Sequence, residues 1–232
     1  MAIAYVNSAS VFSQPAVTSL AVTLDVAAGN LVVLMVVGSK ASAPTITAAD
    51  TAGNSWTAGA IQDDGTGQSW TGGLYSYIGT GNASDVITVS GLNSSSYASL
   101  AALQYSGVAS SGALDVNGYF DNSVAGESAT FNAGPISTVD ANEVIVSCAV
   151  ASRYSNPAID SPYTSRQSQQ YFTCGDQIVS STQSGVSVPY SLSAADWWAT
   201  VVLSFKAASI GPVGGNAPWV TTGVTRFTTH DF

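Results

Sequence analysis

Charged side chains are scarce in this chain of 232 residues, in which Asp, Glu, Lys and Arg together account for 8%. An ordinary soluble domain has about 25%, so the exposed surface must consist mainly of uncharged polar residues. Only five residues are basic, and the formal net charge is −9. Nucleic acids and anionic membrane surfaces are bound by clusters of Lys and Arg, so we expect neither among the partners of this protein.

Residues suited to catalysis are equally few. The single histidine, His230, is two residues from the end of the sequence. It is a poor general base there, because a catalytic histidine must be held rigidly beside its nucleophile. The only glutamates are Glu127, in a loop-like segment, and Glu143, at the start of a strand in its outward phase, so the carboxylate pair of a glycosidase is not expected. The sequence has no HExxH, P-loop or strand-linked GxGxxG motif, and we predict a protein that is not an enzyme.

Cysteine is also rare. Two cysteines alone make no metal site, and we predict none. Cys148 is in phase with the apolar positions Val144, Val146 and Val150, which favours a buried free thiol. A disulfide with Cys174 is the alternative.

Long apolar runs are absent. No run approaches the ~18 residues of a membrane-spanning helix, and the longest, Leu31–Val37, predicts a buried strand. The N-terminal segment has no basic region followed by a long apolar core, so we do not expect a signal peptide. Either a signal has been removed or the protein leaves its cell by lysis or assembly, and Met1 favours the second alternative.

The chain is rich in alternating apolar and polar residues, the pattern of β-strands with one buried face. Residues 20–26, 144–150 and 197–206 show it most clearly, and Gly- and Asn-rich turns separate the runs. The other candidate strands are residues 2–12, 31–37, 55–62, 69–78, 86–92, 97–107, 113–120, 128–137 and 177–190. We find no repeat with a fixed period. About ten to twelve short strands predict an all-β fold, a jelly-roll-like antiparallel β-sandwich over residues 1–208.

Residues 209–232 form a separate segment, which we call the arm. It opens with Gly, Pro and Asn, as a linker does, and continues as an alternating, Thr-rich run. Such a run is suited to adding a strand to the exposed sheet edge of another subunit, although an extra strand of its own domain is equally compatible. The residues expected to make contact are Trp219, Val220, Val224, Arg226 and Phe227.

Aromatic residues are candidates for ligand binding, because their flat apolar faces suit the stacking of sugar rings. Tyr75 and Tyr77 share one face of a predicted strand, and Trp70 lies in the same strand. We predict glycan binding by these three residues. The alternative is that the rings form cross-strand pairs that stabilise the sheet.

Acidic turns suggest a structural calcium ion as the one cofactor to consider. Asp63, Asp64 and Asn82 supply oxygen ligands of the kind that calcium prefers. Their spacing matches no calcium loop, so a solvated turn is the alternative.

Several segments resemble a known class of modules. They are DTAGNSWTAG at residues 50–59, then WTGGLYSYIGTG, VITVSGL and LAALQYSGVASSGALDV, and WWATVVLSFKA at residues 197–207. This series is similar to the jelly-roll modules of bacterial surface proteins and of structural proteins of tailed phages. The resemblance covers residues 1–207 and implies a binding or structural role without any catalytic residue.

Two functions follow as expectations. The first is a structural or adhesive virion component of a tailed bacteriophage, such as a capsid decoration protein, head fibre or tail-associated subunit. Its partners would be other virion subunits, including copies of itself joined through the arm, and its location would be the virion. The second is a carbohydrate-binding module of a secreted or surface protein, with an extracellular location and a surface glycan as its partner.

Overall fold

The computed structural model describes residues 2–39, 44–121, 126–153 and 156–209, and this part of the chain contains sixteen strands and no helix. The first eight strands are β1 (Ala4–Ser13), β2 (Val17–Val26), β3 (Leu31–Ser39), β4 (Thr47–Asp50), β5 (Thr57–Asp63), β6 (Ser69–Tyr77), β7 (Asn82–Ser95) and β8 (Ala98–Ser106). The last eight are β9 (Leu114–Asp121), β10 (Ser128–Ile136), β11 (Glu143–Ala151), β12 (Ala158–Ile159), β13 (Thr164–Gln169), β14 (Phe172–Val179), β15 (Val186–Asp196) and β16 (Trp198–Lys206). The predicted all-β, antiparallel sandwich is confirmed.

The sixteen strands form two units with the same strand order. In the first unit the sheets run β1-β8-β3-β6-β5 and β2-β7-β4, and in the second they run β9-β16-β11-β14-β13 and β10-β15-β12. Adding eight to each strand number therefore converts one unit into the other. The repeat has no fixed period, because the starts of β3 and β11 (31 and 143) are 112 residues apart and those of β8 and β16 (98 and 198) are 100 apart. Loops of unequal length hide the duplication in the sequence.

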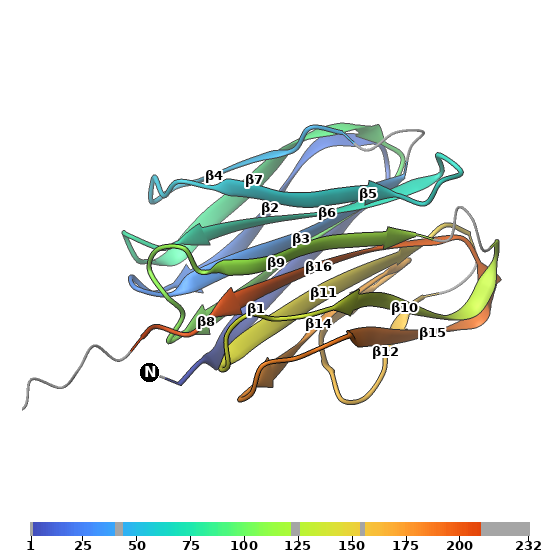
Figure 1. Ribbon diagram of the computed structural model, residues 1–232. Coiled ribbons are helices and arrows are strands. Elements are labelled where there is room, and N and C mark those ends of the chain that lie inside the picture. The colour runs from blue at the N-terminus through green and yellow to red at the C-terminus, as the bar shows by residue number, and fades with distance from the viewer. Residues whose placement is uncertain (1, 40–43, 122–125, 154–155, 210–232) are drawn as a thin grey trace, which may run out of the picture.

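The four sheets stack as layers, as Figure 1 shows, with the two five-stranded sheets inside and the two three-stranded sheets outside. A buried core lies at each of the three boundaries between layers. At the central boundary β1 lies against β13 and β5 lies against β9. Since β1 corresponds to β9 and β5 to β13, the units meet as two copies of one protein meet across a two-fold axis.

Each residue pattern matches its layer. Strand β2, in an outer sheet, alternates between exposed and buried positions towards its end. Strands β3 and β11, in the inner sheets, are buried at every position, because side chains on both of their faces enter a core. In β16 the odd positions from Ala199 to Phe205 enter the central core, while Trp198 and Val202 enter the outer one. Continuous apolar runs are expected where both faces of a sheet are covered.

Polar side chains join the two units at both edges of the central core. Along one edge, Ser8 and Ser10 of β1 exchange hydrogen bonds with Gln167 of β13, each at 2.7 Å. Along the other edge, Asn117 of β9 accepts a 2.6 Å hydrogen bond from the backbone N–H of Ala60 in β5. An apolar centre with a polar rim is the usual anatomy of a stable interface.

The two cysteines lie inside the central core. Cys148 on β11 and Cys174 on β14 are directly opposite each other in the strand register, and both are free and buried. The predicted free thiol at Cys148 is therefore confirmed. Burial raises the pKa of Cys148 to about 12 and that of Cys174 well above its usual range, which keeps both as unreactive thiols at neutral pH.

Candidate functional site

The described residues end at Ser209, just after β16, on the same side of the body as the N-terminal strand β1 begins (Figure 1). We call residues Lys206–Ala208 the arm root. Backbone bonds fix it: Ala207 N–H donates to the carbonyl of Asn142 at 2.9 Å, and Ala208 N–H donates to that of Gly107 at 2.8 Å. The five predicted arm residues, Trp219, Val220, Val224, Arg226 and Phe227, lie outside the described residues.

Two hollows flank the linker that joins the units, residues 107–113. One, of about 670 Å³, lies at the arm root and is lined in part by Asp140, Asn142 and Lys206. Lys206 Nζ is 3.3 Å from Asp140 Oδ2, with both side chains substantially exposed. Exposed ion pairs stabilise a fold little, so this pair does not define a site by itself.

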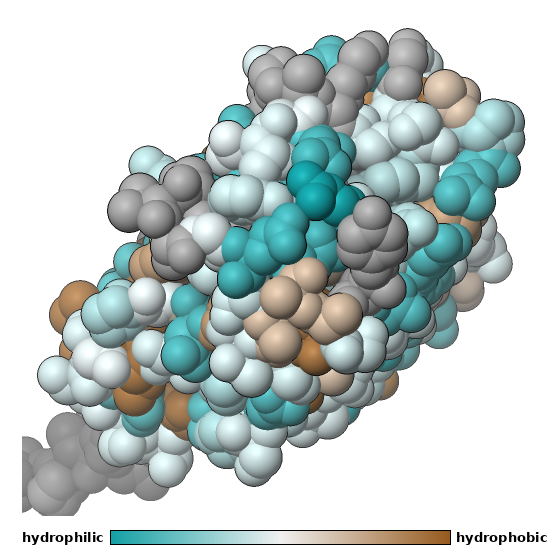
Figure 2. All heavy atoms as spheres, turned by 90° about the vertical axis from the view of Figure 1, so that its right-hand side faces the viewer, coloured by the Kyte–Doolittle hydropathy of each residue, from teal (hydrophilic) through white to brown (hydrophobic). Residues whose placement is uncertain are grey.

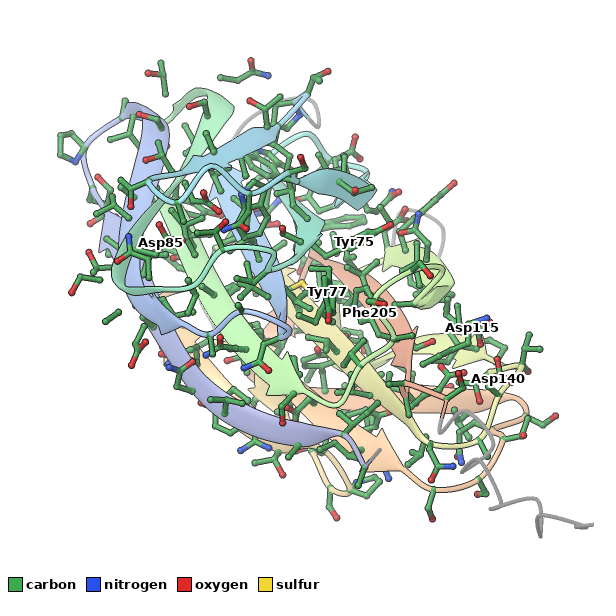
Figure 3. The ribbon with its side chains drawn as sticks, turned by 90° about the vertical axis from the view of Figure 1, so that its left-hand side faces the viewer. Tyr75, Tyr77, Asp85, Asp115, Asp140 and Phe205 are labelled. Carbon is green, nitrogen blue, oxygen red and sulfur yellow. The ribbon has the colours of Figure 1, made fainter. Side chains whose placement is uncertain are left out.

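The other hollow, of about 440 Å³, contains two of the three predicted glycan-binding residues. Tyr75 and Tyr77 both line it, and Figure 3 shows their side chains near each other. We call it the tyrosine hollow. Its remaining lining residues are Leu31, Ser55, Thr57, Ser76 and residues 109–114 of the linker and the start of β9.

Trp70, the third predicted glycan-binding residue, is fully buried. It faces the other side of β6 and packs in the core between the two sheets of the first unit. The prediction was wrong for this residue, because both faces of β6 are covered and a tryptophan on the second face enters an apolar core. A buried ring has no face to offer a sugar.

The predicted calcium ligands do not come together. The Asp64 carboxylate accepts hydrogen bonds from the backbone N–H groups of Thr66 and Ser69 at the start of β6. Asn82 follows the opposite end of β6, where its side-chain oxygen accepts the N–H of Ser84. Within the described ranges no group of three acidic, histidine or cysteine residues is placed to hold a metal ion. Asp63 and Asp64 therefore organise a turn rather than a calcium site shared with Asn82.

The alternation of its strand predicted that Glu143 faces outward, but its side chain has no exposed surface. Its partner is not Glu127, which forms a 2.9 Å ion pair with Arg153. Glu143 lies instead beside Asp115, and Figure 3 shows Asp115 near Asp140. Burial raises the pKa of Glu143; a hydrogen bond with Ser204 opposes this rise, and the neighbouring Asp115 carboxyl adds to it.

The two carboxyl groups hold the β10–β11 loop, residues 137–142, against the body. Asp115 Oδ2 accepts the N–H of Val139 at 2.7 Å, and Glu143 Oε1 accepts the N–H of Asp140 at 3.2 Å. The Glu143 Oε2 atom is buried without a hydrogen-bond partner among the described residues. An ionised Glu143 is therefore poorly stabilised, because one oxygen is unpaired and a second carboxyl is close.

Glu143→Gln is expected to stabilise the protein at pH 7 by about 1 kcal/mol, the scale of a relieved buried polar group. The pKa of Glu143 is higher in the folded state than in the unfolded state. Its contribution to the free energy of unfolding is therefore largest at pH values below the ordinary unfolded pKa. That contribution is lost as pH rises through the raised folded pKa. Urea unfolding between pH 4 and pH 8 should show this decline in the native protein and not in the variant. Glu127→Gln, on the surface, is the control, and an unchanged pH slope in Glu143→Gln would contradict the assignment.

A third hollow, of about 770 Å³, lies at the opposite end of the body and is lined by Arg153, Asn156, Gln170, Tyr171 and Ser193. Tyr171 has a φ of 64° there, and its ring lies 4.9 Å from that of Tyr97 in the first unit. Figure 2, which faces this end, shows a surface of mainly intermediate and hydrophilic residues. Tyr171 thus has a structural role, since its ring joins the two units.

Sequence reasoning did not identify the linker, residues 107–113, as a wall of two hollows. The only signal was the turn that follows residue 106, and a turn does not reveal what it covers.

No helix in the described part of the chain is long and apolar enough to span a membrane. No family model, curated protein or solved structure matches this chain.

Proposed function

We propose that this protein is a non-enzymatic structural component of a tailed-phage virion, such as a capsid decoration protein, head fibre or tail-associated subunit. It would assemble with copies of itself or with other virion subunits through the arm, residues 209–232. The observation that carries this proposal is how firmly the arm root is tied into the body.

Strand β16, which ends at the arm root, is held more firmly than an edge strand would be. It pairs with β11 on one side and β9 on the other, and its residues from Trp198 to Phe205 are buried. Beyond it, the arm root is bonded to the linker and to the β10–β11 loop. A pull on the arm is therefore transmitted to the central core rather than to a strand that can peel away, as an assembly tether requires.

We further propose that each unit is a jelly roll. The first and last strands of each unit are neighbours, and the order is 1-8-3-6-5 in one sheet and 2-7-4 in the other. Apart from the fifth strand, which lies beside the sixth, this is the order that two Greek keys produce. The low charge of the chain supports a subunit that packs densely beside its neighbours, because few charges then have to be desolvated or paired.

Removal of residues 209–232 is expected to abolish assembly and leave the body folded. Circular dichroism and cooperative urea unfolding report on the body, and electron microscopy with light scattering reports on the assembly. The double variant Trp219→Ser, Phe227→Ser removes only the two large apolar side chains of the arm and should weaken assembly in the same direction. Normal particles from the truncated chain would disprove the role of the arm.

A further inference from the structure

We propose that the tyrosine hollow is a binding site for an uncharged saccharide, in which Tyr77 stacks on the sugar and the hydroxyl-rich wall binds its polar edge. The inference is independent of the assembly role of the arm. It narrows the predicted glycan site to one hollow and one class of ligand.

The two tyrosines differ in how firmly they are held. Tyr75 is half-buried, and its ring meets that of Phe205 edge to face, with centroids 5.2 Å apart and an interplanar angle of 65°. Phe205 belongs to the central core, so Tyr75 forms a rigid floor to the hollow (Figure 3). Tyr77 lies two residues further along the same strand face and is 38% exposed. The exposed ring of Tyr77, beside the firmly held Tyr75, suits stacking against the flat apolar face of a sugar.

The rest of the lining is partly polar but uncharged, and it includes Thr57 of β5, the register partner of Tyr75. Ser55, Thr57, Ser110 and Ser111 are exposed residues that line the hollow, and their hydroxyls both donate and accept hydrogen bonds. The twelve lining residues include no Asp, Glu, Lys, Arg or His. Aromatic rings and hydroxyl groups in one hollow match a sugar, which has an apolar C–H face and a hydroxyl-bearing edge.

The lack of lining charge determines the class of saccharide. Binding a uronate, a sialylated or a sulfated sugar would place an anion without a basic partner in a protein of net charge −9. An anion is stabilised by Arg or Lys at close range, and neither lines the hollow. Neutral hexoses and N-acetylhexosamines avoid this cost.

The test uses the full chain and four probes: chitotriose, cellotriose and maltotriose as neutral ligands, and trigalacturonic acid as the acidic one. Isothermal titration and saturation-transfer NMR should detect at least one neutral trisaccharide at millimolar concentration or below, with transfer from tyrosine protons. Tyr77→Ala should weaken this binding at least tenfold, whereas Tyr77→Phe should retain most of it because the ring remains.

Tyr119→Ala is the matched control. Tyr119 is 58% exposed on β9 and is not part of the hollow, so its removal should leave the affinity unchanged. The proposal is overturned if none of the neutral probes binds, if trigalacturonic acid binds as well as they do, or if Tyr77→Ala and Tyr119→Ala have equal effects. None of these results would affect the test of the arm, which measures assembly.

Discussion

Arg166→Leu is expected to lower the free energy of unfolding by about 3–5 kcal/mol, the cost of leaving a buried charge without its partner. Asp176 is 1% exposed, and Arg166 Nε lies 3.1 Å and 3.0 Å from its two carboxylate oxygens. The Arg166 Nη2 atom adds a 3.0 Å contact. After the substitution, Asp176 keeps the 2.7 Å hydrogen bond from the Tyr105 hydroxyl but loses its ion pair with the Arg166 guanidinium.

The loss of stability in Arg166→Leu should affect both units, because Arg166 and its contacts span the boundary between the units. Arg166 and Asp176 belong to the second unit, while Tyr105 and Tyr5 belong to the first. The guanidinium lies 3.8 Å from the centre of the Tyr5 ring, so leucine also removes a cation–π contact. We expect urea unfolding to shift as one transition rather than to split.

Arg153→Leu is the control for this experiment. Its ion pair with Glu127 has side chains that are 34% and 41% exposed, so its loss should cost at most about 1 kcal/mol. The double variant Arg166→Met, Asp176→Leu should recover part of the loss, because no unpaired charge remains. Equal destabilisation by Arg166→Leu and Arg153→Leu would show that the Asp176 cluster is not important for stability.

Leu203→Ala is expected to cost about 2–5 kcal/mol, the range for a cavity in a well-packed core. Leu203 is fully buried on β16 and fills space left by two glycines of the first unit. A methyl group at Gly73 would lie 2.8 Å from Leu203 Cδ1, and one at Gly59 would lie 3.1 Å from Cδ2. A side chain of one unit thus fits a notch in the other.

The two units should therefore lose stability together. Native-state hydrogen exchange can follow each unit separately, because β3 belongs to the first unit and β11 to the second. We expect Leu203→Ala to reduce protection in both strands equally. Separate transitions for the two units would contradict a shared core.

A double-mutant cycle tests the fit directly. Gly73→Ala alone should destabilise by about 1–3 kcal/mol through overpacking. In the Leu203→Ala background the added methyl group enters the vacated space, so the double variant should be more stable than the sum of the single effects predicts. Additive effects would show that the two residues do not share this space.

Much of the fold could be predicted from local sequence patterns. The run Leu31–Val37 predicted a buried strand, and β3 is buried at every position. Residues 97–107 predicted a strand, and β8 covers Ala98–Ser106. The prediction over 177–190 was too long, because a turn separates the end of β14 at Val179 from the start of β15 at Val186. The short strands β4, β12 and β13 carry too few residues for an alternation to be recognised.

The candidate site was predicted less completely, because it depends on contacts between distant strands. Tyr75 and Tyr77 were found from their shared face, yet Trp70 and Glu143 were misplaced. Trp70 faces a core that exists only because a second sheet covers β6. Glu143 is buried because the β10–β11 loop folds over it. The sheet that covers Trp70 comes from distant residues, and the loop beside Glu143 is held in place by Asp115 of β9, which is also distant in the sequence.

By itself, the sequence determined that this protein is all-β, poor in charge and built from strands with defined apolar faces, because a period of two is a local property of the backbone. Tertiary structure alone decided that the strands form two units, that the inner sheets are covered on both faces, and that the linker meets Tyr75 and Tyr77 in one hollow. The physical reason is that burial depends on which surface lies opposite, and that surface comes from residues far away in the chain.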